Sequence, residues 1–331
     1  MNDSQKKVRA LGLCSGGLDS RLSGAVLKQQ GIDVHWITFE TPFFSADKAR
    51  QAAHQQDIPL IVENITEIYL EMLKNPPCGY GKYMNPCLDC HALMFRLAGK
   101  HMVSDGFDFL FSGEVLGQRP MSQTKPSLRY VEKNSGYPGY ILRPLSARLL
   151  PETIPEQEGL VDRSQLLDLS GRGRKPQIKL AEAFGITDYP APAGGCLLTD
   201  KGYSGRLKEL FEHDDNPSEA DLHLLKYGRH FRLPAGAKII VGRTKSDNDA
   251  MVKYYDRSAD TLIRLAGGPG PLVLIPKVFE DPIVRLAASI AVGYSKTPVD
   301  SSAEVKVTSP EGTQVIRVLG LKPGDVKRLM I

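Results

Sequence analysis

The segment Ser15-Gly16-Gly17-Leu18-Asp19-Ser20 constrains the fold of this chain more than any other. It follows an apolar run at residues 8–14, which predicts a short buried strand. It precedes apolar residues at helical spacing over residues 20–30, which end at Gly31. Glycines in such a turn let backbone N–H groups face an anion, and the helix N-terminus adds about half a positive charge. The segment therefore predicts a phosphate site at the carboxyl edge of a parallel sheet.

The residues of this loop have different expected roles. The backbone of Gly16 and Gly17 and the hydroxyls of Ser15 and Ser20 are candidate phosphate donors. Asp19 is acidic, so we expect it to bind Mg²⁺ instead. The alternative is a plain strand-to-helix turn capped by serine. The loop lacks the Gly-Lys-Ser/Thr ending of a Walker loop, which disfavours a kinase-like NTPase.

Strand and helix patterns alternate along the first 200 residues. Strands are expected at 33–39, 59–62 and 107–112, and helices at 45–56, 65–73 and 176–185. Residues 120–160 are rich in Pro, Ser and Gly and are expected to be loop and connector. This alternation predicts an α/β domain with a doubly wound parallel sheet.

The pattern changes near residue 205, so we place domains at 1–204 and 205–331. The second domain is expected to be smaller and α+β. Its expected elements are a helix at 218–226, strands within 230–242 and 270–278, a helix at 281–294 and a strand pair at 304–319.

Composition excludes some classes of protein. The chain has 331 residues, a hydrophobic fraction of 41% and a formal net charge of +4, which permits an anionic partner without requiring one. No apolar run approaches the roughly 20 residues that cross a bilayer, and the N-terminus lacks the features of a signal peptide. A cytoplasmic protein with no membrane partner is expected. Five cysteines, an odd number, argue against a disulfide framework.

The glycine-rich loop resembles the PP-loop of the ATP pyrophosphatases. The stretch Gly113-Glu114-Val115-Leu116-Gly117-Gln118, with Leu142-Arg143-Pro144-Leu145, resembles the tRNA 4-thiouridine synthetases. The stretch Asn85-Pro86-Cys87-Leu88-Asp89-Cys90 is similar to the cysteine motif of the tRNA 2-thiouridylases. The resemblance covers about residues 8–200. It implies that ATP is cleaved between its α and β phosphates to adenylate an oxygen, with Gly113 and Gln118 in the nucleotide site. Phe39 ends the second strand, where adenine-binding residues lie in such folds, or it is an ordinary strand end.

Three cysteines are candidates for sulfur chemistry: Cys87, Cys90 and Cys196. Three thiolates resemble the iron–sulfur members of the wider thiolation family, in which they hold a 4Fe–4S cluster and leave one iron open. The alternatives are a redox pair of Cys90 and Cys196, a zinc site completed by His91, and inert buried thiols. The sulfur donor would be sulfide or a persulfide carrier. Asp89 is a candidate general acid or base, or a helix cap.

Two groups of basic residues are candidates for RNA contacts. Arg172, Arg174 and Lys175 form a dense basic loop that holds RNA phosphate or is simply solvated charge. In the second domain, basic residues crowd residues 226–253, with Tyr227 and Phe231 interleaved for stacking on bases.

The second-domain segment Ile239-Ile240-Val241-Gly242-Arg243-Thr244-Lys245-Ser246-Asp247-Asn248-Asp249 resembles the signature of the NFACT-type RNA-binding domain. The resemblance covers about residues 225–331 and implies RNA binding, with Arg229, Arg243 and Lys245 as contacts. Asn248 and Asp249 are otherwise helix-capping residues.

Taken together, the motifs predict a tRNA sulfurtransferase that uses ATP and Mg²⁺. Two alternatives remain: a PP-loop enzyme that adenylates a small molecule, and an RNA-binding adaptor with a vestigial ATP site. The intact Ser15, Gly16, Gly17, Asp19 and Ser20 argue against the adaptor.

Overall fold

The phosphate-loop sequence emerges from the central strand of a five-stranded parallel sheet. The computed structural model describes residues 7–191, 195–298 and 300–331. The strand order is β3-β2-β1-β4-β5, and every pairing is parallel. The strands are β1 (Arg9–Leu13), β2 (Asp33–Glu40), β3 (Leu60–Asn64), β4 (Phe109–Ser112) and β5 (Ile141–Leu142). The predicted doubly wound α/β fold is confirmed.

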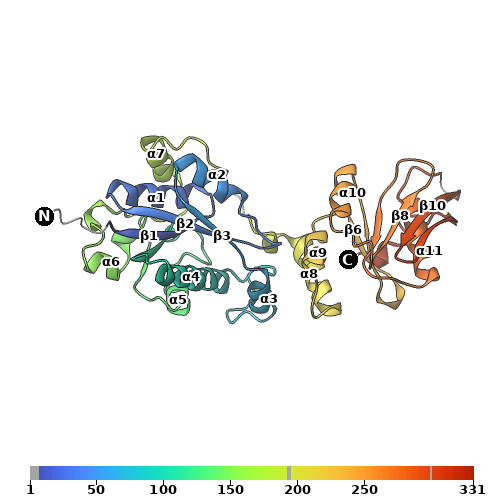
Figure 1. The fold of residues 1–331 in the computed structure, drawn as a ribbon, viewed down its shortest axis with the longest axis horizontal. Helices are drawn as coiled ribbons and strands as arrows, with labels where there is room; N and C mark the ends of the chain where they lie inside the picture. Colours follow the sequence, from blue (N-terminus) through green and yellow to red (C-terminus); the bar gives the residue numbers. More distant parts are fainter. Residues whose placement is uncertain (1–6, 192–194, 299) are drawn as a thin grey trace. The chain divides into compact units, whose positions relative to one another are not determined.

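Helices cover both faces of this sheet (Figure 1). One face carries α1 (Leu18–Gln29), α2 (Asp47–Gln56) and α7 (Lys175–Ala183), and α1 packs against α7. The other face carries α4 (Cys87–Ser104) and α5 (Lys125–Ser135), with α3 (Thr66–Lys74) packed on α4. A short helix, α6 (Ile154–Gln157), follows β5. Among the described residues, no helix combines the length and apolarity that crossing a bilayer requires.

Helix α5 corrects the expectation that residues 120–160 are only loop and connector. Its polar and glycine residues are the end signals of a helix. Thr124 caps the N-terminus by accepting from the Ser127 N–H at 3.3 Å, and a proline stands in the first turn. Gly136 ends the helix in the left-handed conformation, with φ +85°. Some of the residues that suggested a loop therefore mark the beginning and the end of α5.

The chain divides into two units between Thr199 and Asp200, a few residues before the expected boundary at 204/205. The expected boundary falls inside α8 (Lys201–His213). Asp200 caps α8 by accepting from the Tyr203 N–H at 2.7 Å, so the helix belongs to the second unit as a whole.

The second unit contains an antiparallel sheet of six strands in the order β11-β10-β8-β9-β7-β6, which confirms the predicted α+β class. The strands are β6 (Arg229–Arg232), β7 (Lys238–Val241), β8 (Thr261–Leu265), β9 (Val273–Ile275), β10 (Ser302–Ser309) and β11 (Gly312–Leu319). Helix α11 (Asp281–Gly293) packs on this sheet and shares a core with it. A smaller core joins Ile240 and Leu274 to α9 (Glu219–Leu224) and α10 (Lys245–Val252).

Candidate functional site

The phosphate loop is shaped by two glycines. Gly16 adopts φ +71°, and a Cβ there would lie 2.2 Å from the Lys48 carbonyl carbon, so only glycine fits. Gly17 occupies the N-cap of α1 in an extended conformation and has no side chain to bind the first N–H groups. These donors therefore remain available to an anion. The Ser15 side chain is exposed beside them, whereas the Ser20 hydroxyl donates to the Gly17 carbonyl at 2.8 Å and stabilises the loop itself.

Arg21 holds the loop from behind, a role that sequence analysis missed. It is only 2% exposed, and its Nε donates to the Gly16 carbonyl at 3.1 Å. One of its terminal nitrogens donates to Gln55 Oε1 and to the Asp188 carbonyl, each at 2.6 Å. Burial lowers the pKa of this guanidinium, and the negative charge of Asp188 opposes that shift. An arginine on an otherwise apolar helix face gave the only sequence signal.

Asp19 lies next to the loop with one oxygen unused. Gln118 donates to Asp19 Oδ2 at 2.8 Å, but Asp19 Oδ1 is buried without a partner. Burial raises the pKa of this carboxyl, while the Gln118 hydrogen bond and the charge of Arg174 lower it. A buried carboxylate oxygen with no partner suits a Mg²⁺ ion.

Two further unpartnered atoms come from helix α7 and the residue before it. Gln177 donates to Gln118 Oε1 at 3.2 Å, and its own Oε1 is buried without a partner. The Nε of Arg174 is likewise buried without a partner. Arg174 acts electrostatically on Asp19, which places it in the surroundings of the phosphate loop. Its neighbours Arg172 and Lys175 are exposed.

The end of β4 packs tightly on the start of α1. A Cβ on Gly113 would lie 2.4 Å from the Asp19 carbonyl carbon and from the Ser20 nitrogen, so this position requires glycine. Phe39 is 3% exposed and lies in the interior at the end of β2. The structure thus brings Gly113 and Gln118 to the phosphate loop and gives Phe39 no exposed ring surface.

The three candidate cysteines gather around one tyrosine. Cys87 and Cys90 lie in the first turn of α4, and Cys196 directly precedes a short 3₁₀ turn at Leu197–Thr199. Tyr69 of α3 is fully buried, and the charges of Cys87, Cys90 and Cys196 all act on its hydroxyl. That hydroxyl has no aligned hydrogen-bond partner, yet it is close enough to Cys90 to lower the pKa of that thiol.

Aromatic packing and one backbone bond hold this group in place. The Tyr69 ring lies 5.6 Å from the ring of Phe43 and 5.3 Å from that of Phe44. The Leu197 N–H donates to the Phe43 carbonyl at 2.9 Å, which fixes the chain beside Cys196. Sequence analysis did not identify Tyr69, because a tyrosine within an amphipathic helix is ordinarily a core residue.

Burial opposes ionisation of two of these thiols, Cys90 and Cys196. It raises the pKa of Cys90 far above its usual range, and the charges of Cys196 and Cys87 raise it further. Burial also raises the pKa of Cys196 to about 11, against a hydrogen bond from the Leu198 N–H. Asn85 donates to the Cys87 sulfur at 3.2 Å. Because the thiolate is the nucleophile and the metal ligand, this site needs positive charge nearby to become reactive.

Among the described residues, the cysteine group lacks the fourth ligand that the zinc alternative requires. In the part of the chain that the structure describes, no three His, Cys, Asp or Glu side chains are grouped to hold a metal ion. His91, the fourth ligand of the zinc alternative, is bonded instead to Glu114 through Nδ1 at 3.0 Å. In a four-iron cluster each cysteine binds a different iron, so the sulfurs stand farther apart than around one ion. Three soft sulfur donors without a fourth ligand match that chemistry.

Asp89 is a structural anchor in this conformation. It is 6% exposed; Oδ2 accepts from the Cys78 N–H at 2.8 Å and Oδ1 from the Tyr130 hydroxyl at 2.9 Å. The N-cap of α4 is Pro86, so Asp89 is not the cap either. Both oxygens position the chain around the cysteine helix. Cys14, expected to be a core residue, is 4% exposed in the core of this unit.

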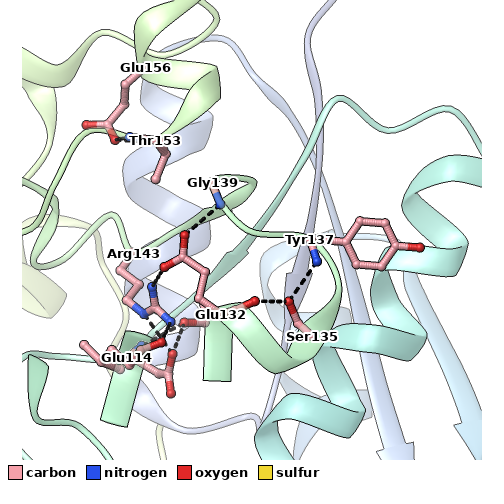
Figure 2. A network of polar contacts seen from close by, with 10 residues as sticks. Glu114, Glu132, Ser135, Tyr137, Gly139, Arg143, Thr153 and Glu156 are labelled. Carbon is pink, nitrogen blue, oxygen red and sulfur yellow. Dashed lines mark hydrogen bonds and ion pairs between the residues drawn. The ribbon is translucent and has the colours of Figure 1, made fainter. Parts of the chain in front are cut away.

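Arg143 forms a buried ion-pair network with Glu114 and Glu132 (Figure 2). Glu114 is 6% exposed; its Oε2 accepts from Arg143 Nε at 3.0 Å and its Oε1 contacts His91. Arg143, 4% exposed, also lies 3.6 Å from Glu132. Burial is the largest single effect and opposes ionisation of Glu114, but the charges and hydrogen bonds of Arg143 and His91 together outweigh it and lower the pKa to about 2.

The basic segment of the second unit is only partly on the surface. Arg243 and Lys245 are exposed, and Arg243 is paired with Asp247 at 2.8 Å. Arg229 lies 4.8 Å above the Tyr294 ring. Phe231, predicted to stack on bases, is fully buried and cannot do so without rearrangement.

The other members of that segment have structural roles. His230 and Lys238 are 1% and 8% exposed. Asn248 binds the loop before β9, accepting from the Leu272 N–H at 3.1 Å and donating to the Gly270 carbonyl at 3.3 Å, while Thr244 caps α10. Of the candidate RNA contacts in this segment, Arg243 and Lys245 are the exposed ones, at the start of α10.

Part of each unit is similar to a known family. Residues 5–148 match the family model described as thiamine biosynthesis protein (ThiI), and residues 228–330 match that of the NFACT protein RNA binding domain. A probable tRNA sulfurtransferase of Oceanobacillus iheyensis is 27% identical over 146 residues, covering 41% of this chain and 34% of that protein.

Two further proteins are similar over other shares of the chain. A tRNA-specific 2-thiouridylase MnmA of Caldicellulosiruptor saccharolyticus is 25% identical over 60% of this chain and 58% of its own length. A solved structure, described as a predicted subunit of tRNA methyltransferase from Methanocaldococcus jannaschii, has a TM-score of 0.35 at 18% identity, covering 53% of this chain and 76% of that one. The chain spans between about a third and three fifths of the length of these curated relatives.

Proposed function

We propose that this chain is an ATP-dependent tRNA thiouridylase, because residues 5–148 match the ThiI family model and residues 228–330 match that of the NFACT RNA-binding domain. In this proposal the enzyme acts in the cytoplasm, binds tRNA, ATP and Mg²⁺, and receives sulfur from sulfide or a persulfide carrier. The observation that carries the proposal is the gathering of Cys87, Cys90 and Cys196 around Tyr69, in the same unit as the phosphate loop.

The first half-reaction activates a uridine. The uridine carbonyl oxygen attacks the α-phosphorus of ATP, pyrophosphate leaves, and the oxygen becomes bonded to AMP. The N–H groups at the start of α1 would stabilise the departing phosphates, and Asp19 Oδ1 would hold a Mg²⁺ ion, which would neutralise their charge. Activation is needed because a carbonyl oxygen is a very poor leaving group, whereas AMP departs readily.

The second half-reaction exchanges oxygen for sulfur. Sulfur at the oxidation level of sulfide attacks the activated carbon, and the C–O bond breaks as AMP leaves with the oxygen, so no electrons are gained or lost. Cys87, Cys90 and Cys196 would hold a 4Fe–4S cluster, which supplies an open iron that can carry sulfide. Tyr69 would direct its hydroxyl to the sulfur of Cys90, and Asp89 keeps the first turn of α4 in place.

Turnover with tRNA tests the proposal directly. Anaerobically purified protein is incubated with unmodified tRNA, ATP–Mg²⁺ and sulfide, and AMP and thiolated nucleosides are measured by mass spectrometry. We expect one AMP for each thiouridine formed. AMP formation that does not depend on RNA would favour a small-molecule substrate. RNA binding without any AMP would favour an RNA-binding adaptor.

Arg174→Met tests whether this arginine serves ATP and not RNA. Because its buried Nε has no partner beside Asp19, we expect the KM for ATP to rise about tenfold, as when one charge-assisted hydrogen bond is lost. Arg172→Met is the matched control, since its side chain is exposed. An unchanged KM for ATP in Arg174→Met, with weaker tRNA binding, would return Arg174 to the RNA-binding residues.

Tyr69→Phe tests the contact between Tyr69 and the cysteines. Without the hydroxyl, the pKa of Cys90 rises further, so we expect alkylation of Cys90 by iodoacetamide to slow by about two- to tenfold in protein without a cluster. The fold should persist, because the phenyl ring keeps its packing on Phe43 and Phe44. Tyr80→Phe removes a hydroxyl bonded to the Leu73 carbonyl and serves as control. Equal alkylation rates in both variants would show that Tyr69 does not act on Cys90.

A further inference from the structure

The second unit contains a cavity of about 520 Å³ that the reaction described above does not use. It lies beside the N-terminus of α11, and β8, β10 and β11 contribute to its lining. Apolar lining comes from Phe279, Ile283, Val284 and Val307, and Phe279 is half-buried. The cavity therefore has an aromatic and aliphatic wall of the kind that accepts a flat ring.

Thr261 places an unsatisfied hydroxyl in the lining of this cavity. The residue is 1% exposed, and its Oγ1 has no hydrogen-bond partner. An unpaired buried hydroxyl costs about 1–3 kcal/mol, so native structures rarely retain one without a reason. A ligand in the cavity would give this hydroxyl its partner.

Two strained residues border the same cavity. Ala235, in the lining, has φ +59°, and Lys277, next to the lining residue Val278, has φ +78°. Neither residue is a glycine, and left-handed conformations of this kind cluster at ligand sites. These two conformations support the location that the unpartnered Thr261 hydroxyl indicates.

Carboxylates determine which ligand fits. Glu280, Asp281 and Glu311 line the cavity, and only Asp281 has an ion-pair partner among the described residues, Arg285 at 2.5 Å. This acidic lining repels phosphate but accepts hydrogen bonds from amino groups, as carboxylates do from the cytosine amino group. The wall of Phe279 adds a stacking surface worth about 1–3 kcal/mol for each base.

We propose that this cavity binds one unstacked pyrimidine base that carries an exocyclic amino group, which is cytosine in preference to uracil. The Thr261 hydroxyl and the carboxylates recognise the edge of the base while Phe279 packs on its face. The phosphates of the same strand remain outside, away from the acidic lining. This inference rests on the proposed function, since it assumes that the second unit binds RNA.

Short oligoribonucleotides test the preference in the full chain. We compare the dissociation constants of fluorescently labelled ACCA and AUUA by anisotropy, at one fixed salt concentration. We expect ACCA to bind about fivefold or more tightly, the lower end of the range for one mismatched base position. Equal affinity for the two oligonucleotides would overturn the proposal, as would displacement of both by spermidine, which would show a site for cations.

Thr261→Val separates binding from stability. Because valine removes an unpartnered hydroxyl without changing the shape, we expect the melting temperature to stay the same or rise while the preference for ACCA falls about fivefold. Phe279→Ala should weaken both oligonucleotides about tenfold. Thr313→Val, an exposed threonine on β11, is the matched control.

The two proposals fail in different ways. An unchanged ACCA preference in Thr261→Val would exclude the cavity as the source of the preference. If tRNA still binds and is thiolated in that case, only the cavity proposal falls. If the wild-type chain binds no tRNA at all, the proposed function falls with it.

Discussion

Cys87→Ala is expected to abolish thiolation of tRNA while ATP binding remains unchanged. Cys87 lies in the cysteine group around Tyr69, and the phosphate loop is built from β1, α1 and Gly113, with no contribution from α4. In a three-cysteine cluster every ligand is needed, so loss of one removes the cofactor and the activity together. Thiolated nucleosides are measured by mass spectrometry, and ATP binding by calorimetry.

The iron and sulfide contents of Cys87→Ala provide a second measurement on this variant. Wild-type protein purified without oxygen should contain about four irons per chain with acid-labile sulfide and a broad absorbance near 400 nm. Cys87→Ala should contain much less of each. Cys78→Ala is the matched control, because Cys78 is exposed and its only contact with Asp89 is through its backbone N–H. Normal thiolation by Cys87→Ala would point to persulfide chemistry at Cys90 and Cys196.

Glu114→Gln is expected to destabilise the protein by about 3–5 kcal/mol, the usual effect of leaving one charge of a buried pair without its partner. Arg143 would lose the full charge that accepts from its Nε, and His91 would lose its partner. Urea denaturation measures the change. Glu132→Gln is the matched control with a smaller expected effect, because Glu132 is 27% exposed and lies farther from Arg143, at 3.6 Å. Equal losses of unfolding free energy in Glu114→Gln and Glu132→Gln would show that Glu114 is no more important to the ion-pair network than Glu132.

The same carboxylate predicts an acid sensitivity. Its pKa falls from 4.5 to about 2 on folding, so its contribution to stability is fully present above about pH 4.5 and is lost as the pH falls towards 2. A shift of this size corresponds to about 3 kcal/mol. In Glu114→Gln, that part of the acid destabilisation should be missing from the pH dependence of unfolding. A wild-type pH dependence in the variant would assign the effect to other carboxyls.

The sequence predicted the fold where periodicity was unambiguous. Alternating strands and helices up to Asn64 were placed within a few residues, because buried parallel strands and amphipathic helices have distinct patterns. Helix α4 was not predicted, because its first turn was interpreted only as a cysteine motif. Its N-terminus also has no side-chain cap that would signal a helix. Helix α8 was also missed, and the domain boundary with it, because Asp200 as a cap does not stand out from an ordinary surface aspartate.

The sequence identified only those candidate site residues that belong to recognisable motifs. The loop glycines and the three cysteines have recognisable spacing, whereas Arg21, Tyr69 and Arg143 do not. Each of these three acts through contacts with distant segments, such as Arg21 with the Asp188 carbonyl, and no local pattern encodes such pairs. Arg174 was predicted to contact RNA, and charge density in a sequence does not reveal that its Nε is buried.

The carboxyl end of β4 has a consequence for the order of events. Gly113 presses against the first turn of α1, and the next residue, Glu114, is bonded to the imidazole beside Cys90. These two successive residues directly follow β4, and they contact helix α1 and helix α4 respectively. If α1 faces the nucleotide and α4 carries the sulfur chemistry, as we propose, this stretch of backbone connects the two half-reactions. We therefore expect nucleotide occupancy to change the NMR signals of the His91 ring.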